Sequence, residues 1–210
     1  MARLGEPSRQ AQVAGAIAAA LGVDADVAGR LADAAVVESL RAHETLALAP
    51  AIVVRGAVKL VSERDVVLDL ARAPLVALAG PWRWIALRAS VVAHLEPSDL
   101  DAQLRGLSAA QASLAASLAE RIESRAALTV EARLELLLAG LAARYGTRVG
   151  GGTFVALPLR GRDAASLLGT TTETISRVLA AWKRSGRVRA SRDGIWVRAR
   201  EAQRRYAATR

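Results

Sequence analysis

The chain has 210 residues, a formal net charge of +9, 52% hydrophobic residues and no cysteine. This length allows two modest domains or one large one. The lack of cysteine excludes disulfide bonds, thiol redox chemistry and cysteine-ligated iron–sulfur clusters.

The positive charge is concentrated in the C-terminal part of the chain. Residues 128–210 hold 16 Lys and Arg against 6 Asp and Glu, a net charge of +10, whereas residues 1–127 carry −1. A basic segment of this kind indicates nucleic acid as a partner. A solvated basic face or an arginine-rich genome would give the same excess, but the excess coincides with the motif described below.

Other classes of function find little support. Only two histidines are present, His43 and His94, and the sequence shows no Ser–His–Asp or metal-ligand cluster, so we expect neither an enzyme nor a metal site. The apolar runs are too short, or too interrupted by charge, to span a membrane, and the N-terminus has no signal-peptide pattern. We therefore expect a cytoplasmic protein without a membrane partner.

The N-terminal part predicts two helices followed by short strands. A helix over residues 11–21 ends at Gly22, and a second helix spans about 26–41 with an apolar stripe of Val27, Leu31, Ala34 and Ala35. From residue 44 to 96 the pattern changes to β-branched runs separated by Gly, Pro and charged residues, which is typical of strands. Gly56 divides the first run and indicates a bend or bulge.

Trp82 and Trp84 alternate in one of these runs, so both rings should face the same side of a strand. Three roles are open to them: they could line an apolar ligand pocket, stack a flat cofactor or fill the core of the domain. With only 3% aromatic residues in the chain, we favour the core. His43 and His94 leave haem ligation as an alternative, but two scattered histidines are weak evidence, and we expect no cofactor.

A long helix over residues 98–125 follows. Apolar residues in it alternate by four and three, which is the spacing of a coiled-coil seam and predicts a parallel dimer. The seam comprises Leu100, Leu104, Leu107, Gln111, Leu114, Leu118 and Arg121. Gln111 is the kind of polar insertion that fixes register and partner number. An amphipathic helix packed on its own domain would show a similar stripe.

The next segment predicts a capped helix and a short strand. Thr129 caps a helix over residues 130–145, whose apolar face comprises Leu134, Leu137, Leu138 and Leu141. Residues 150–152 are three glycines, which we interpret as a flexible connector. The strand TFVALPL after them is expected to pair with a later hairpin.

The stretch GRDAASLLGTTTETISRVLAAW, from residue 161, has the pattern of a helix-turn-helix. A short helix spans 162–168, and Gly169 stands where the turn requires a positive φ. Thr171 is the expected N-cap of the second helix. The inward stripe of that helix comprises Ile175, Val178 and Leu179.

The opposite face of the second helix carries side chains suited to reading base edges in a major groove, namely Thr172, Glu173, Ser176 and Arg177. A basic hairpin follows, with strands over 187–190 and 195–199 joined by a turn that contains Asp193-Gly194. Helix, turn, helix and hairpin in this order predict a winged helix.

The segment LLGTTTETISRVLAAWKRSGRVRASRDGIWV resembles the DNA-binding domain of the cyclic-AMP receptor protein and fumarate–nitrate reductase regulator (Crp/Fnr) family. The family signature is a Gly turn followed by Ser/Thr-x-Glu-Thr-Ile/Val-Ser/Gly-Arg, and it is matched by Gly169, Thr171, Glu173, Thr174, Ile175, Ser176 and Arg177. The resemblance is strong over residues 129–199 and weak upstream. It implies an α+β fold in three parts: an N-terminal jelly-roll (double-stranded β-helix, cupin-like) sensor domain, a dimerisation helix and a C-terminal winged helix-turn-helix, over residues 1–97, 98–127 and 128–210.

The chain departs from the cyclic-nucleotide binders of that family at their phosphate-binding cassette, a Gly-Glu followed after a short helix by Arg-Ser/Thr. Here residues 74–80 run directly into PWRWIAL, with no Gly-Glu, helix or Arg-Ser. Because the cassette's Arg and helix N-terminus hold the cyclic phosphate, we do not expect this degenerate sensor domain to respond to cyclic AMP.

The resemblance implies a homodimeric, sequence-specific transcription regulator of double-stranded DNA. Its recognition helices, residues 171–182, would enter successive major grooves about 34 Å apart. Arg177 would donate to a guanine, Glu173 would accept from a cytosine amine, and Ser176 and Thr172 would tune neighbouring positions. The phosphate contacts would be Thr171, Lys183, Arg184, Arg187, Arg189 and Arg192.

Thr172 stands where the cyclic-AMP branch of the family places a second Arg. We therefore expect an inverted repeat of half-sites closer to TTGAT than to TGTGA. RNA polymerase is a further partner that the resemblance suggests. The alternative is a regulator whose N-terminal domain senses a small molecule or haem and thereby gates DNA binding.

Overall fold

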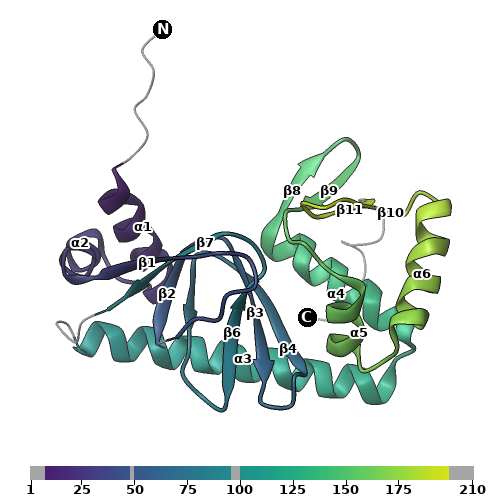
Figure 1. Ribbon diagram of the computed structural model, residues 1–210, viewed down its shortest axis with the longest axis horizontal. Coiled ribbons are helices and arrows are strands. Elements are labelled where there is room, and N and C mark those ends of the chain that lie inside the picture. Colours follow the sequence, from purple (N-terminus) through teal and green to yellow (C-terminus); the bar gives the residue numbers. More distant parts are fainter. Residues whose placement is uncertain (1–7, 48–49, 96–99, 199–210) are drawn as a thin grey trace, which may run out of the picture. The chain divides into compact units, whose positions relative to one another are not determined.

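The computed structural model describes residues 8–47, 50–95 and 100–198 (Figure 1). They form two compact units, one made of residues up to 65 with 69–116, and the other of residues 66–68 with those from 117 onward. Helices and strands are mixed in both units, which confirms the expected α+β class.

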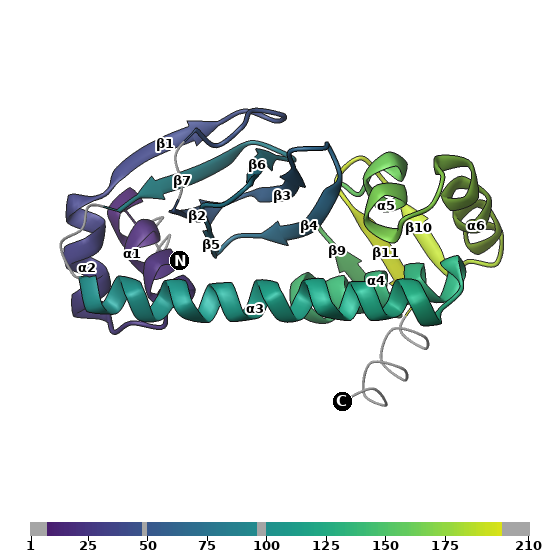
Figure 2. The same ribbon diagram turned by 90° about the horizontal axis from the view of Figure 1, so that it is seen from below.

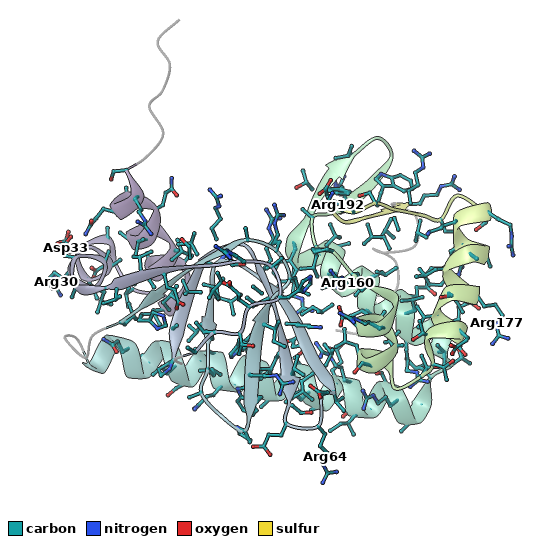
Figure 3. All side chains as sticks on the ribbon, viewed as in Figure 1. Arg30, Asp33, Arg64, Arg160, Arg177 and Arg192 are labelled. Atoms are coloured by element: carbon teal, nitrogen blue, oxygen red, sulfur yellow. The ribbon has the colours of Figure 1, made fainter. Side chains whose placement is uncertain are left out.

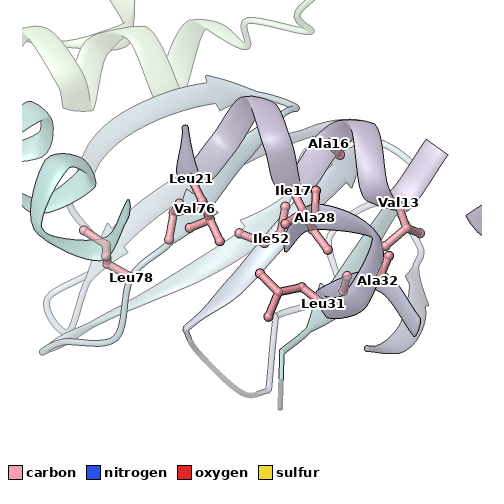
Figure 4. Packing of buried hydrophobic residues seen from close by; sticks show 11 residues of the cluster. Val13, Ala16, Ile17, Leu21, Ala28, Leu31, Ala32, Ile52, Val76 and Leu78 are labelled. Carbon is pink, nitrogen blue, oxygen red and sulfur yellow. The ribbon is translucent and has the colours of Figure 1, made fainter. Parts of the chain in front are cut away.

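Two short helices open the first unit. Helix α1 (Arg9–Leu21) begins at Ser8, whose side chain accepts from the Ala11 N–H, and ends at Gly22 with a φ of 67°. Helix α2 (Ala25–Ala34) begins at Asp24, whose carboxylate accepts from the Val27 N–H. Both helices contribute to one apolar cluster (Figure 4), which includes Val13 and Ile17 of α1, Leu31 of α2, and Ile52 and Val76 from the strands that follow.

The second helix is shorter than the sequence predicted. Residues 36–40 form strand β1 (Val36–Leu40), which pairs antiparallel with β7 (Ser90–His94) along its whole length. The helical stripe therefore ends near Ala35, and Ala34 is exposed. Adjacent Val36 and Val37 favour a strand, and pairing with β7 satisfies backbone groups that an isolated helical turn would not.

The strands of the first unit form two sheets. Their orders are β1-β7-β2-β5 and β4-β3-β6, and the bounds not yet given are β2 (Ala51–Arg55), β3 (Ala57–Ser62), β4 (Val67–Arg72), β5 (Leu75–Ala77) and β6 (Trp82–Ala86). Gly56, with a φ of 114°, lies between β2 and β3, and a Cβ there would collide with Ser90. The β2–β7 register also shifts between Val53 and Arg55, which confirms the predicted bend or bulge in this run.

The two tryptophans of β6 belong to the core. The indole N–H groups of Trp82 and Trp84 both donate to the Leu78 carbonyl oxygen at 2.9 Å, so the rings lie on the same side of the strand. Trp84 is 5% exposed, and Trp82 packs against the apolar cluster. This confirms the interpretation that the rings fill the domain.

Two features of the first unit concern ligand binding: the connection between β5 and β6, where a cyclic-nucleotide cassette would lie, and the two histidines, which were considered as haem ligands. Residues 78–81 connect β5 directly to β6, and no helix occurs among residues 50–95. His94 contacts the Glu38 carboxylate at 3.0 Å, and His43 occupies a left-handed turn with a φ of 76°. Within the described ranges, no three His, Cys, Asp or Glu residues form a group that fits a metal ion.

Helix α3 (Leu100–Ala127) follows the sheets, and Figure 2 shows its start beside α1 and α2. A Cβ at Gly106 would collide with Leu21, so glycine permits this close packing. Leu107, Ala110 and Leu114 pack against the apolar cluster of the same chain, as an amphipathic helix on its own domain would. The side chains of Leu100 and Leu104 lie outside the described residues.

Where the helices are described, none is by itself both long and apolar enough to cross a bilayer. Only α1 and α2 together, bent by 120° at their junction, meet the length and composition that a span requires.

The second unit contains the predicted C-terminal elements. Helix α4 (Val130–Tyr145) has the predicted bounds, and the Thr129 side chain accepts from the Ala132 N–H. The other elements are β8 (Gly146–Val149), β9 (Gly152–Val155), α5 (Gly161–Leu168), α6 (Thr172–Arg184), β10 (Val188–Ala190) and β11 (Ile195–Arg198). The sheet order is β10-β11-β9-β8, so the predicted strand after the glycines does pair with the later hairpin.

Strand β8 was not predicted, and the glycines before β9 are not a loose connector. Gly150 and Gly151 have φ values of 52° and 74° and join β8 to β9 as a tight hairpin. Two successive positive φ values are what a two-residue hairpin turn of type I′ requires, so this turn needs glycine. The expected basic hairpin is also present, with the Ser191 N–H donating to the Gly194 carbonyl oxygen.

Candidate nucleic-acid interface

Local hydrogen bonds set the angle between α5 and α6. Gly169 ends α5 in the left-handed conformation, with φ and ψ of 61° and 51°. Two residues later, the Thr171 hydroxyl accepts from the Thr174 N–H at 3.2 Å and begins α6. The turn and the cap are both as the sequence predicted.

The inward face of α6 is fixed by packing and by one polar anchor. Ile175 is fully buried, Trp182 is 4% exposed, and Val178 and Leu179 are half-buried. The Trp182 indole N–H donates to Glu131 Oε1 at 2.8 Å, which ties the C-terminal half of α6 to the first turn of α4. Trp182 was not predicted as part of the inward stripe, although it lies seven residues after Ile175 on the same face.

The outward face of α6 carries the four predicted base-reading residues. Thr172, Glu173, Ser176 and Arg177 are all exposed, and Figure 3 shows Arg177 pointing away from α5. The helix presents them in its first two turns, the part of a recognition helix that contacts base edges in known complexes. Their exposure leaves all four side chains accessible to a partner.

Glu173 is held in its charged form. Its backbone N–H, and secondarily the Thr171 hydroxyl, hydrogen-bond the carboxyl group and keep the pKa of Glu173 below its ordinary value of 4.5. The positive end of the α6 dipole acts in the same direction. At neutral pH this side chain therefore offers only acceptor oxygens.

Most of the predicted phosphate contacts are available on the surface. Lys183 and Arg184 are exposed in the last turn of α6, and Arg192 is exposed at the tip of the β10–β11 hairpin. Arg189 is exposed on β10, with its guanidinium 4.9 Å from the centre of the Trp196 ring. Thr171 is exposed at the opposite, N-terminal end of α6, where its hydroxyl oxygen also serves as the cap.

Arg187 differs from the expectation. Its guanidinium lies 4.3 Å from the centre of the Trp182 ring, 3.5 Å from Glu131 Oε1 and 3.9 Å from Glu135 Oε2, and its side chain is only 24% exposed. These contacts direct Arg187 inward, so the structure gives it a packing role in place of the predicted phosphate contact. Sequence spacing did not reveal this because the two glutamates are about 50 residues away.

Trp196 is a second residue whose role was not predicted from the sequence. Its indole N–H donates to the Val149 carbonyl oxygen at 2.8 Å, across β9. Gly152 makes room for the ring, because a Cβ at that position would collide with Trp196. The ring thus joins the β8–β9 hairpin to the strand that pairs with Arg189.

Comparisons with known proteins agree with this geometry. A family model described as a Crp-like helix-turn-helix domain matches residues 132–206. No curated protein matches the chain at a significant level.

Solved structures match over most of the chain. FixK2 from Bradyrhizobium japonicum is 23% identical with a TM-score of 0.65, covering 82% of this chain and 96% of that one. A CooA mutant from Carboxydothermus hydrogenoformans is 17% identical with a TM-score of 0.65, covering 85% and 89%. A transcriptional regulator of the CRP/FNR family from Thermus thermophilus is 18% identical with a TM-score of 0.58, covering 77% and 93%. The chain therefore carries a Crp-like helix-turn-helix domain at its C-terminus, and as a whole it has the fold of Crp/Fnr family transcription regulators.

Proposed function

We propose that the chain is a homodimeric, sequence-specific DNA-binding transcription regulator that acts in the cytoplasm by binding and not by catalysis, with α6 as its recognition helix. One observation carries the proposal: the first two turns of α6 expose Thr172, Glu173, Ser176 and Arg177. Ile175 and Trp182 hold the opposite face of the same helix in the domain core. A helix fixed on one side and polar on the other is what major-groove reading requires.

The chemistry of the exposed face suggests which bases it reads. Arg177 has the paired donors that suit guanine, and the ionised Glu173 suits the amino group of cytosine. Ser176 and Thr172 would then discriminate at neighbouring positions. We propose an inverted repeat of half-sites closer to TTGAT than to TGTGA.

Affinity would come mainly from phosphate contacts on either side of α6. Lys183 and Arg184 at its C-terminal end and Arg189 and Arg192 on the hairpin are exposed cations in the basic part of the chain. Thr171 would add a hydroxyl contact. Arg187 is left out of this set because Trp182, Glu131 and Glu135 surround it.

The proposed homodimer uses α3, with a seam on another face of the helix than the one that the spacing of leucines predicted. Leu107 and Leu114 pack on their own chain, whereas Gln111 is exposed and Leu118 is half-buried. Ser108, Ala115 and Ile122 continue the alternation of three and four with these two residues, and all three are exposed, Ile122 to 69%. We therefore propose that the seam is Ser108, Gln111, Ala115, Leu118 and Ile122.

The sensor domain is proposed to act without cyclic AMP and without a resident haem. Supporting the first point, residues 78–81 join β5 to β6 with no room for the cassette helix. Supporting the second, His94 is engaged by Glu38. Calorimetry should show no heat of cyclic-AMP binding at micromolar concentrations, and DNA affinity should be the same with and without the nucleotide.

The test of the function is selection of bound sites from a random duplex library with the purified full chain. We expect an inverted repeat whose half-site centres lie about one helical turn apart. Enrichment of TGTGA half-sites, or of single half-sites, would contradict the assignment of the recognition helix. No enrichment at all would contradict sequence-specific binding. RNA polymerase, proposed as a further partner, is then tested by co-binding on the selected duplex.

A further inference from the structure

The C-terminal end of α5 leaves carbonyl groups that its own helix cannot satisfy. The last four carbonyls of any α-helix lack intrahelical donors. In α5 these belong to residues 165–168, and the turn supplies part of what they need. The Thr170 N–H donates to the Ala165 oxygen at 3.0 Å, and the Gly169 N–H donates to the Ser166 oxygen at 3.2 Å.

Two arginines from outside the helix-turn-helix satisfy the rest. Arg125 Nη2, in the last turn of α3, donates to the Ser166 oxygen at 3.1 Å and to the Leu167 oxygen at 2.9 Å. Arg133 Nη1, in the first turns of α4, donates to the Leu168 oxygen at 2.6 Å. We call Arg125 and Arg133 the arginine clamp. Two positive charges at the negative end of the α5 dipole add to these hydrogen bonds.

The clamp lies directly on the turn that precedes α6. A Cβ at Gly169 would come within 3.2 Å of Arg125 Nε, closer than side chains usually approach. Gly169 therefore has two tasks: it adopts a positive φ, and it makes room for the guanidinium of Arg125. Only Thr170 separates it from Thr171, the cap of α6.

We propose that Arg125 is a positioning residue of the DNA-binding site. Through the carbonyls of Ser166 and Leu167 it holds the α5–α6 turn, and with it the N-terminal turns of α6, in register with the last turn of α3. The last turn of α3 is then part of the structure that positions α6 on DNA, so a displacement of that turn would alter base reading. This inference rests on the proposed function, because it concerns how that site is held.

Two other roles of Arg125 make different predictions. As a phosphate contact, Arg125 would add charge alone, so its loss would weaken binding to every duplex and lysine would restore it. As a purely stabilising residue, it would lower the unfolding temperature without changing the preference among duplexes. A positioning residue lowers the ratio of specific to non-specific affinity in a chain that remains folded.

The experiment measures binding of the full chain to two duplexes, one with the selected site and one with the same composition but scrambled half-sites. The variants are Arg125→Gln and Arg125→Lys, with Arg105→Gln as the control. Arg105 is an exposed arginine of the same helix in the first unit, and its substitution changes the net charge equally. All measurements are made at one salt concentration, well below the unfolding midpoint of each variant.

We expect Arg125→Gln to lower the affinity ratio about tenfold, the size of effect that a displaced bidentate base contact gives. Arg125→Lys should lower the ratio similarly while leaving non-specific binding near the parent level, because lysine keeps the charge but lacks the planar fork. Arg105→Gln should leave the ratio unchanged. Full restoration by lysine, or an unchanged ratio in Arg125→Gln, overturns the proposal.

Amide hydrogen exchange supplies a readout that needs no DNA. Arg125→Gln should speed exchange over residues 169–175 by about fivefold or more relative to Arg105→Gln, because the carbonyls of the turn lose their donors. If no duplex is bound, the proposed function fails, while exchange still decides whether the clamp holds the turn. Equal exchange in the two variants overturns the clamp.

Discussion

Thr171 serves two neighbouring groups at the start of α6. Its hydroxyl accepts from the Thr174 N–H at 3.2 Å, and it contributes, after the backbone N–H, to the lowered pKa of Glu173. Because the pKa of Glu173 is lowered, the favourable effect of its carboxylate is complete above the ordinary value of 4.5 and is lost as the pH falls through the lowered pKa. The N-terminal turn of α6 is therefore insensitive to pH near neutrality.

Thr171→Ala should lower the free energy of unfolding by about 1 kcal/mol, the usual cost of losing an N-cap. It should also raise the pKa of Glu173 part of the way to its ordinary value, because the backbone N–H remains. Urea denaturation and an NMR titration of the Glu173 carboxyl carbon measure these effects. Thr171→Ser is the control, because it keeps the hydroxyl and should change neither quantity appreciably.

Arg177 and Arg189 are both exposed, but we expect them to act differently on DNA. Arg177→Ala should cost about 1–3 kcal/mol of binding free energy and flatten the preference at one guanine. Arg189→Ala should weaken all sequences alike and reduce the salt slope by about one. Titrations with matched and substituted duplexes at several salt concentrations separate the two patterns, and identical behaviour of the two variants would contradict these roles.

At the scale of elements, one cluster attaches α6 to α4. Trp182 donates to Glu131, and Arg187 stacks on Trp182 and faces the same carboxylate. The cluster explains why a basic residue next to the hairpin is turned inward. It also fixes the end of α6 opposite to the arginine clamp, so both ends of α6 are held by α3 and α4.

Arg187→Ala should lower the free energy of unfolding by about 1–2 kcal/mol, since it removes a cation–π contact and a partly exposed ion pair. The salt slope of DNA binding should stay unchanged. Arg184→Ala is the matched control: the same charge is lost three residues earlier at an exposed position, so stability should hardly change while the salt slope falls by about one. A reduced salt slope in Arg187→Ala would restore Arg187 to the phosphate contacts.

At the scale of the whole molecule, we expect a lysine on one face of α3 to disrupt the proposed dimer and a lysine on the other face to destabilise the single chain. Ile122→Lys places a charge on the proposed seam, at a side chain that is 69% exposed in the single chain. It should convert dimers to monomers, because an unpaired charge buried at an interface costs about 3–5 kcal/mol. The stability of the single chain should not fall, because the side chain is exposed there. Leu107→Lys, on the face that packs on its own chain, should instead lower the unfolding temperature. Light scattering and thermal unfolding of both variants are the measurements, and an Ile122→Lys chain that stays dimeric would contradict the seam.

The sequence by itself determined those features of the protein that depend on neighbours a few residues apart. The bounds of α4, the left-handed Gly169, the cap at Thr171 and the hairpin after α6 follow from hydrogen bonds and φ restrictions within short segments. The exposed polar face of α6 follows equally, because helical periodicity decides it once Ile175 is inside. For this reason the helix-turn-helix was predicted almost residue by residue.

Only the tertiary structure decided features whose partners lie far along the chain. Strand β1 replaces the end of a predicted helix because β7, about 50 residues later, supplies its hydrogen bonds. Leu107 and Leu114 face their own domain because α1 and α2 provide the apolar cluster there. In the sequence, nothing distinguishes Arg125 and Arg187 from any surface arginine. The carbonyls of α5 and the glutamates of α4 give them their roles, since a long cationic side chain is directed by whichever acceptors the fold brings within reach.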